Sequence, residues 1–289
     1  MPTQSGRPEV VRRIGRGIRP RRRALEPTWS EPDRGDSSWL PVQTIPFDLE
    51  ALVAPAGPPV RCTQELHPAS VERRPDGRLI VDFGQNFAGR VRLSGDKAGP
   101  EVVVRHAEVL QGGELYVRTL RTAVSIDRYL SAGGRIDWEP RFTIHGFRFA
   151  EISGWEGDPA ELKIVGRVYH SDMPRTGWFT CLNDDVNRLH EAVVWSMRSN
   201  FVDIPTDCPQ RDERLGWTGD IQVFTPTAAY LFDCSGFLNS WLADLAIEQG
   251  KSGTVPWFVP NPPAHEKWCQ ARPAAVWGDV AVLTPWDLF

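Results

Sequence analysis

The hydrophobic period of this chain changes once, near residue 180, and this change constrains the fold more than any other feature. From about residue 46 to 170, short runs alternate apolar with polar side chains and are separated by Gly, Pro and Asp. These runs are 79–83, 90–94, 101–105, 125–129, 147–152 and 162–168. Such a pattern is typical of an antiparallel β-sandwich. Beyond residue 180 apolar side chains recur every three or four positions, which predicts helices packed through one face.

Four helices are expected in the second part. The first has its apolar face on Leu182, Val186, Leu189, Val193 and Met197, with Thr180 or Asn183 as N-cap. A second helix is expected at about 220–233, and a last one from Ala274 to the chain end. The third has Gly250 as C-cap, and its apolar side consists of Phe237, Leu238, Trp241, Leu242 and Leu245. Proline and glycine in 203–219 and 251–272 predict two long loops. The predicted organisation is a basic, disordered tail (1–36), a β-sandwich (37–172) and a helical domain (173–289).

Composition excludes several classes of function. The net charge is −4, and residues 1–23 alone hold eight Arg and one Glu, so the remainder is acidic. This balance argues against nucleic-acid binding through a general basic field. No stretch has the roughly 18 consecutive apolar residues of a membrane helix, and the N-terminus lacks the apolar segment of a signal peptide. A soluble protein located in the cytoplasm is therefore expected.

Tryptophan and cysteine narrow the expectation further. Eight of the 12 Trp follow residue 170; we expect most to be core residues, although exposed indoles also bind the apolar faces of sugar rings. The five Cys form no CxxC pair, and their odd number favours reduced thiols. The spacing of His265 and Cys269 is too weak to indicate a metal site. No metal and no cofactor are predicted.

The segment 203–220 concentrates charged side chains in a loop stiffened by two prolines. It contains two Arg, one Trp and the carboxylates of Asp203, Asp207, Asp212, Glu213 and Asp220. Glycoside hydrolysis requires such groups, because one carboxylic acid protonates the leaving oxygen and another carboxylate activates water or attacks the sugar. Crowded acids also raise one another's pKa, which favours a protonated general acid. Composition alone equally allows a solvated loop of ion pairs. Cys208 is expected to be a buried thiol, since the segment has no His to activate it.

The motif DCPQRDERLGWTGD at residues 207–220 resembles the signature of bacterial α-L-rhamnosidases of glycoside hydrolase family 78. The resemblance continues at 82–89, 105–110, 113–116 and 139–147 upstream, and at 273–279 and 282–286 downstream. It covers roughly residues 37–289. The resemblance implies a concanavalin-like antiparallel β-sandwich followed by the first helices of an (α/α)6 barrel.

The resemblance also implies an activity, the inverting hydrolysis of terminal α-L-rhamnose from glycosides or polysaccharides. Glu213 matches the general acid. The residues that match sugar-holding positions are Asp207, Arg211, Trp217 and Asp220, with Trp277 and Asp279 as further contacts. The family's general base is a Glu that lies beyond residue 289.

The chain is therefore expected to be a truncated piece of a longer enzyme, inactive alone, with the missing C-terminal half of the barrel as a partner. The alternatives are a glycosidase of the same barrel for another sugar, a non-catalytic carbohydrate-binding protein and an inert remnant.

Overall fold

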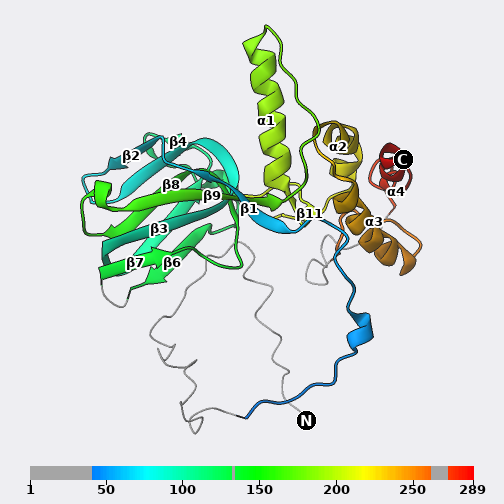
Figure 1. Ribbon diagram of the computed structural model, residues 1–289, viewed down its shortest axis with the longest axis horizontal. Helices are drawn as coiled ribbons and strands as arrows, with labels where there is room; N and C mark the ends of the chain where they lie inside the picture. The colour runs from blue at the N-terminus through cyan, green and yellow to red at the C-terminus, as the bar shows by residue number, and fades with distance from the viewer. Residues whose placement is uncertain (1–40, 132–133, 262–272) are drawn as a thin grey trace.

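The computed structural model describes residues 41–131, 134–261 and 273–289. The predicted basic tail and the pair His265 and Cys269 lie outside these ranges. The described chain has a sheet domain, formed by residues 60–171, and a helical domain, formed by residues 184–288 (Figure 1). This order agrees with the change of hydrophobic period in the sequence.

The sheet domain is built around one long, curled strand. Its strands are β1 (Val60–Leu66), β2 (Ser70–Arg73), β3 (Leu79–Ala107), β4 (Leu110–Gln111), β5 (Glu114–Leu115), β6 (Ile126–Leu130), β7 (Gly134–Trp138), β8 (His145–Trp155) and β9 (Lys163–Ser171). All pairings are antiparallel, and β3 pairs with β2, β6, β7, β8 and β9. The three runs predicted between residues 79 and 105 are thus parts of a single strand.

The curl of β3 places both of its ends beside β8. Ile152 of β8 pairs with Leu79 at one end of β3 and with Val104 at the other. The pairing shifts register after Asp82, where Gly84 adopts a φ of 75° that favours glycine. The bend encloses an apolar core around the rings of Phe83, Phe87 and Phe147.

A polar network is buried in this domain beside the core. His145 Nε2 lies 3.0 Å from Asp127 Oδ2, and His145 Nδ1 lies 3.2 Å from Ser125 Oγ. The ring of His106 stacks on that of His145, with centroids 4.3 Å apart and an interplanar angle of 21°. A metal ion must lie in the plane of each imidazole that binds it, which two nearly parallel stacked rings do not allow. The arrangement therefore indicates a structural role for His145.

The buried imidazole of His106 should make the stability of the sheet domain depend on pH. Burial, helped by the charge of His145, lowers the pKa of His106 from 6.5 to about 3, although Asp127 acts in the opposite direction. Below pH 6.5 the unfolded chain therefore binds a proton that the folded chain does not bind. Stability from this group is full above pH 6.5 and is lost as the pH falls, by about 2 kcal/mol at pH 5.

Urea unfolding at pH 7.5 and at pH 5 should show this loss in the wild type. His106→Gln removes the titrating group, so its unfolding free energy should depend less on pH even if the variant is less stable throughout. Equal pH dependence of the two proteins would remove His106 as the cause.

The helical domain contains α1 (Asp184–Asn200), α2 (Thr218–Leu231), α3 (Ser235–Gly250) and α4 (Val280–Leu288), with short strands β10 (Phe201–Val202) and β11 (Ile204–Pro205) after α1. Asn183 is the N-cap of α1, as predicted, since its side-chain oxygen accepts hydrogen bonds from the amides of Asp185 and Val186. Helices α2, α3 and α4 share an apolar core that includes Ile221, Trp241 and Val280.

Details of the helical domain differ from the sequence prediction. Gly250 is the last residue of α3, and the left-handed conformation is adopted by Gly253 instead, with a φ of 74°. Helix α4 begins at Val280 rather than at Ala274, because turns occupy the preceding residues. Of the seven described Trp after residue 170, Trp241 is fully buried, four are partly buried, and Trp178 and Trp286 are exposed, so fewer lie fully in the core than expected.

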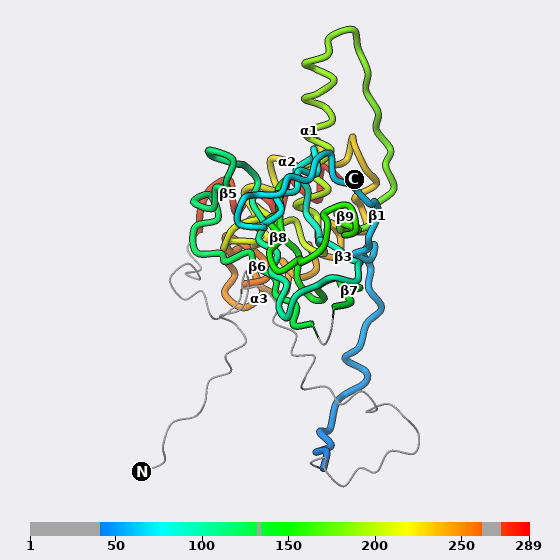
Figure 2. The backbone as a smooth tube through the Cα atoms, turned by 90° about the vertical axis from the view of Figure 1, so that its left-hand side faces the viewer, coloured from blue at the N-terminus to red at the C-terminus, as the bar shows by residue number. Residues whose placement is uncertain are grey.

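Helix α1 projects away from the rest of the molecule (Figures 1 and 2). Only Val194 and Met197, near its C-terminal end, are buried. Leu182 and Leu189, on the predicted apolar face, are exposed to solvent. Within the described ranges, no helix combines the length and apolar character needed to cross a membrane.

Candidate active site

The predicted catalytic segment is a loop closed at its base by one residue pair. The amide of Asp207 donates to the carbonyl of Leu215 (3.1 Å), and the amide of Leu215 donates to Asp207 Oδ1 (3.0 Å). Beyond the loop, Trp217 is the N-cap of α2. Its ring packs edge to face against that of Phe258, with the ring centroids 5.2 Å apart. This closure fixes the ends of residues 208–214, so their side chains are presented from a defined backbone.

Glu213 lies at the centre of the charged groups of this loop. Arg211 Nε and Nη2 lie 2.7 Å and 2.6 Å from Glu213 Oε2, and Arg211 Nη2 also lies 3.7 Å from Asp207 Oδ2. The Asp207 side chain is only 7% exposed, whereas Glu213 and Arg211 are partly accessible. Charge-assisted hydrogen bonds of this kind are strong and directional. They hold the Glu213 carboxylate in one orientation.

Asp207 and Asp220, the two acids predicted to bind the sugar, have raised pKa values. Burial is the main cause for Asp207, and the charge of Glu213 adds to it. Asp220 remains partly open to solvent, but surrounding protein atoms partly desolvate it and raise its pKa, again with a contribution from Glu213. The sequence predicts that neighbouring acids raise one another's pKa. For Asp207 and Asp220 this effect is present, but burial contributes more to the raised pKa. Perturbed acids gathered in one place are typical of functional sites.

A half-open cavity of about 220 Å³ brings these two acids together. Its wall is formed by Ser196, Met197, Asn200, Phe201, Pro205, Thr206, Asp207, Asp220, Ile221 and Phe224. The cavity thus combines two carboxyl groups with aromatic and apolar side chains. Small-molecule sites commonly have this composition, a mostly apolar wall with a few polar groups that fix orientation.

The aromatic residues predicted for sugar binding lie at the N-terminal end of α2. Trp277 packs against Gly219, where an added Cβ would lie only 3.0 Å from the indole. The indole N–H groups of Trp217 and Trp277 are both buried and have no hydrogen-bond acceptor among the described residues. Asp279 has a local role, since its carboxylate accepts from the amide of Val276 (3.1 Å) in the turn before α4. The structure therefore brings both Trp to the N-terminal end of α2 and shows no comparable contact for Asp279 among the described residues.

The loop also offers a cluster of possible metal ligands, in which atoms of Asp207, Cys208 and Glu213 lie within 4.8 Å of one another. Cys208 is buried, as predicted, and burial raises the pKa of its thiol to about 11. A thiol binds a metal ion as the thiolate, and the Arg211 guanidinium already forms ion pairs with the carboxylates of Asp207 and Glu213. The chemistry of this cluster therefore suits an ion-paired loop better than a metal centre.

Sequence reasoning missed three residues at this site. Arg121 Nη1 lies 3.1 Å from Glu213 Oε2, and the hydroxyl of Thr122 donates to Asp212. Arg214 is largely buried and donates to the carbonyl of Ile144 (2.6 Å). Arg121 and Thr122 lie about 90 positions before the loop, and no pattern around them signals a site. Arg214 was inside the segment, but its burial could not be read from composition.

Comparison with known proteins agrees with this architecture. Residues 72–170 match the bacterial α-L-rhamnosidase concanavalin-like domain, and residues 174–289 match the bacterial α-L-rhamnosidase six-hairpin glycosidase domain. An α-L-rhamnosidase of Streptomyces avermitilis is 43% identical over 266 residues, which are 90% of this chain and 25% of that protein. An α-L-rhamnosidase of an Alteromonas species is 41% identical over 267 residues, which are 90% of this chain and 28% of that protein. The chain thus spans about a quarter of the length of these curated relatives.

Solved structures give the same result. The native α-L-rhamnosidase of Aspergillus terreus superimposes with a TM-score of 0.82 at 42% identity, over 91% of this chain and 31% of that one. The Streptomyces avermitilis α-L-rhamnosidase complexed with L-rhamnose has a TM-score of 0.76 at 42% identity, over 82% of this chain and 23% of that one. These matches confirm the predicted order of domains. The chain thus consists of a concanavalin-like domain followed by a six-hairpin glycosidase domain, each matching the corresponding domain of bacterial α-L-rhamnosidases.

Proposed function

We propose that this chain carries the sugar-binding loop and the general acid of an α-L-rhamnosidase that removes terminal α-L-rhamnose with inversion of configuration. The observation that carries this proposal is the position of Glu213, held by Arg211 beside two acids of raised pKa, Asp207 and Asp220. In this mechanism Glu213 protonates the leaving oxygen. Asp207, Arg211 and Asp220 bind ring hydroxyls, while Trp217 and Trp277 offer apolar ring surface.

Binding of L-rhamnose to the chain tests this function. Removing one charge-assisted contact should weaken binding about 10- to 100-fold, so Asp220→Ala should bind L-rhamnose far more weakly than the wild type in calorimetry. Asp137→Ala is the matched control, because Asp137 forms an exposed ion pair with Arg92 on the sheet domain. Equal affinities of wild type and Asp220→Ala would remove Asp220 from the site, and equal affinities for L-rhamnose and D-glucose would contradict the sugar assignment.

The general base of the proposed mechanism is not Asp207. Inverting glycosidases keep their two carboxyl groups roughly 6.5–9.5 Å apart so that a water fits between them, whereas oxygens of Asp207 and Glu213 lie within 4.8 Å. Asp220 belongs to the same short segment. We propose that the base comes from a part of the barrel that the 289-residue chain does not contain, as the resemblance implies.

The chain alone is therefore expected to bind L-rhamnose without releasing nitrophenol from a nitrophenyl rhamnoside. Wild-type chain should give no more nitrophenol than a sample without protein. Turnover of the nitrophenyl rhamnoside by the wild-type chain would place a base within these residues and overturn this expectation.

We further propose that the exposed apolar faces of the helical domain contact additional helices of the same barrel. Exposed side chains include Leu182, Leu189, Val282, Trp286 and Phe289. Apolar patches of this kind mark interfaces, and the relatives are about four times as long as their matched part.

A cytoplasmic location is also proposed, supported by free thiols at Cys62, Cys181, Cys208 and Cys234.

A further inference from the structure

The loop of residues 207–215, here called the catalytic loop, contacts the sheet domain on several sides. Gly146 of β8 packs so closely against the loop that an added Cβ would lie 2.8 Å from Pro209 Cγ. Arg214 donates to the carbonyl of Ile144, just before β8. These contacts flank Glu213 and come from outside the helical domain that carries it. The orientation of the loop therefore depends on the sheet domain.

One segment of the sheet domain reaches Glu213 directly. After β5 the chain forms the 3₁₀ turn η4 (Arg118–Leu120), in which Leu120 is buried. Arg121 follows with a φ of 54°, and its amide donates to the carbonyl of Arg118 (3.3 Å). Few residues other than glycine adopt this conformation, and it persists where the surroundings determine it. The turn directs the guanidinium of Arg121 to Glu213 Oε2 at 3.1 Å.

The neighbouring residue supports the same contact. The hydroxyl of Thr122 donates to Asp212, next to Glu213. Burial alone would raise the pKa of Asp212, but hydrogen bonds from Thr122 and from backbone amides, with the charge of Arg121, bring it below its usual value. Two successive residues of the sheet domain thus bind two successive acids of the loop.

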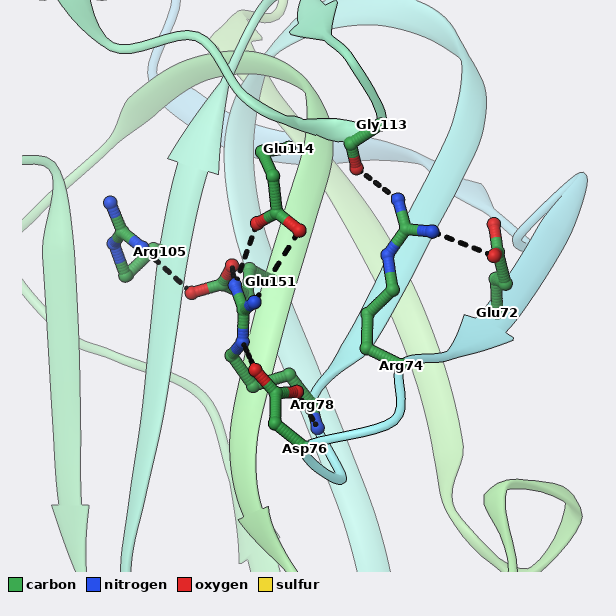
Figure 3. A network of polar contacts seen from close by, with 8 residues as sticks. All are labelled: Glu72, Arg74, Asp76, Arg78, Arg105, Gly113, Glu114 and Glu151. Carbon is green, nitrogen blue, oxygen red and sulfur yellow. Dashed lines mark hydrogen bonds and ion pairs between the residues drawn. The ribbon is translucent and has the colours of Figure 1, made fainter.

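A network of ion pairs anchors the hairpin that precedes this turn (Figure 3). Arg78 Nη1 lies 2.8 Å from Glu114 Oε2 in β5 and also contacts Glu151, which is buried in β8. Arg74 donates to the carbonyl of Gly113 between β4 and β5. The hairpin is therefore fixed to the turn between β2 and β3, and through Arg78 to β8, immediately before the chain turns toward the loop.

We propose that Arg121 is a positioning residue for Glu213, supplied by the sheet domain, which fixes the carboxyl group at the anomeric oxygen of bound L-rhamnose. This inference rests on the proposed function, since Glu213 is the general acid there. Arg121 has a partly exposed side chain (51%), and such an ion pair stabilises the fold little. Its effect should therefore appear in sugar recognition at one atom rather than in overall stability.

The test compares two ligands in the 289-residue chain. Arg121→Met should bind L-rhamnose about 3- to 5-fold more weakly, and Arg121→Lys should recover part of the loss. Binding of 1,5-anhydro-L-rhamnitol, which lacks the anomeric oxygen, should be the same in Arg121→Met as in the wild type. Arg118→Met, three residues earlier, is the matched control and should bind both ligands normally. Equal weakening for both ligands, or no weakening at all, would overturn the proposal.

A second measurement needs no sugar and separates this proposal from the proposed function. The side-chain carboxyl carbon of Glu213 can be assigned by NMR from its loss in Glu213→Gln. This resonance should move in Arg121→Met and stay in place in Arg118→Met. If the wild type bound no L-rhamnose but the resonance moved, the proposed function would fail while Arg121 would still be shown to orient Glu213. A resonance that did not move would refute the positioning role.

Discussion

Replacing Glu213 by Gln should reduce hydrolysis of a natural rhamnoside about 10²- to 10⁴-fold, the contribution that general acid catalysis typically makes. The measurement needs an active enzyme, such as this chain joined to the C-terminal remainder of the Streptomyces relative. Glutamine preserves the shape of the side chain but cannot donate a proton of suitable acidity. KM should change less than kcat, because most binding contacts are made by other residues.

The choice of leaving group provides the control for Glu213→Gln. A nitrophenyl rhamnoside has a leaving group that departs without protonation, so the variant should hydrolyse it with a much smaller loss than an alkyl rhamnoside. Equal losses on the two substrates would make Glu213 a binding residue. Asp212 or Asp207 would then become the candidate acid.

Replacing Trp241 by Ala should lower the unfolding free energy by about 3–5 kcal/mol, the usual cost of deleting a large buried aromatic side chain. Trp241 of α3 is 1% exposed, and its indole N–H donates to the carbonyl of Val259 (3.1 Å). It also lies directly against Gly216, next to the 207–215 loop. The loss should therefore affect both the helical core and the loop.

Urea unfolding followed by circular dichroism measures this loss. Trp241→Phe is the control, since it keeps most of the apolar volume and removes only the N–H donor and part of the ring. Its loss should be clearly smaller than that of Trp241→Ala. Similar values for the two variants would indicate that the hydrogen bond to Val259, rather than packing, determines the stability contributed here.

Local features of the fold were predictable from the sequence because they depend on neighbouring residues. Asn183 caps α1 through hydrogen bonds to amides two and three positions ahead, so its role follows from residue type and position. The alternation of apolar and polar side chains along β3 likewise identifies the face of the strand that is buried. The curl of β3 was not predictable, since it depends on the pairing of Ile152 with both Leu79 and Val104.

In the candidate site, too, residues close in sequence were predictable, whereas residues brought in by tertiary contacts were not. Asp207, Arg211 and Glu213 lie within seven residues, and the loop that closes between Asp207 and Leu215 necessarily keeps them together. Arg121 comes from another domain, and only the docking of η4 against the loop reveals it. The position of Asp279 could not be inferred either, because its hydrogen bond to Val276 depends on where α4 begins.

A crystal structure of this chain with bound L-rhamnose would show directly whether Glu213 is placed as the acid. The sugar should lie in the 207–220 loop, with its anomeric oxygen within about 3 Å of Glu213 and its ring hydroxyls hydrogen-bonded to Asp207 or Asp220. Trp217 or Trp277 should contact the ring. A sugar bound elsewhere, or bound in the loop with Glu213 remote from the anomeric carbon, would contradict the assignment of Glu213 as the acid.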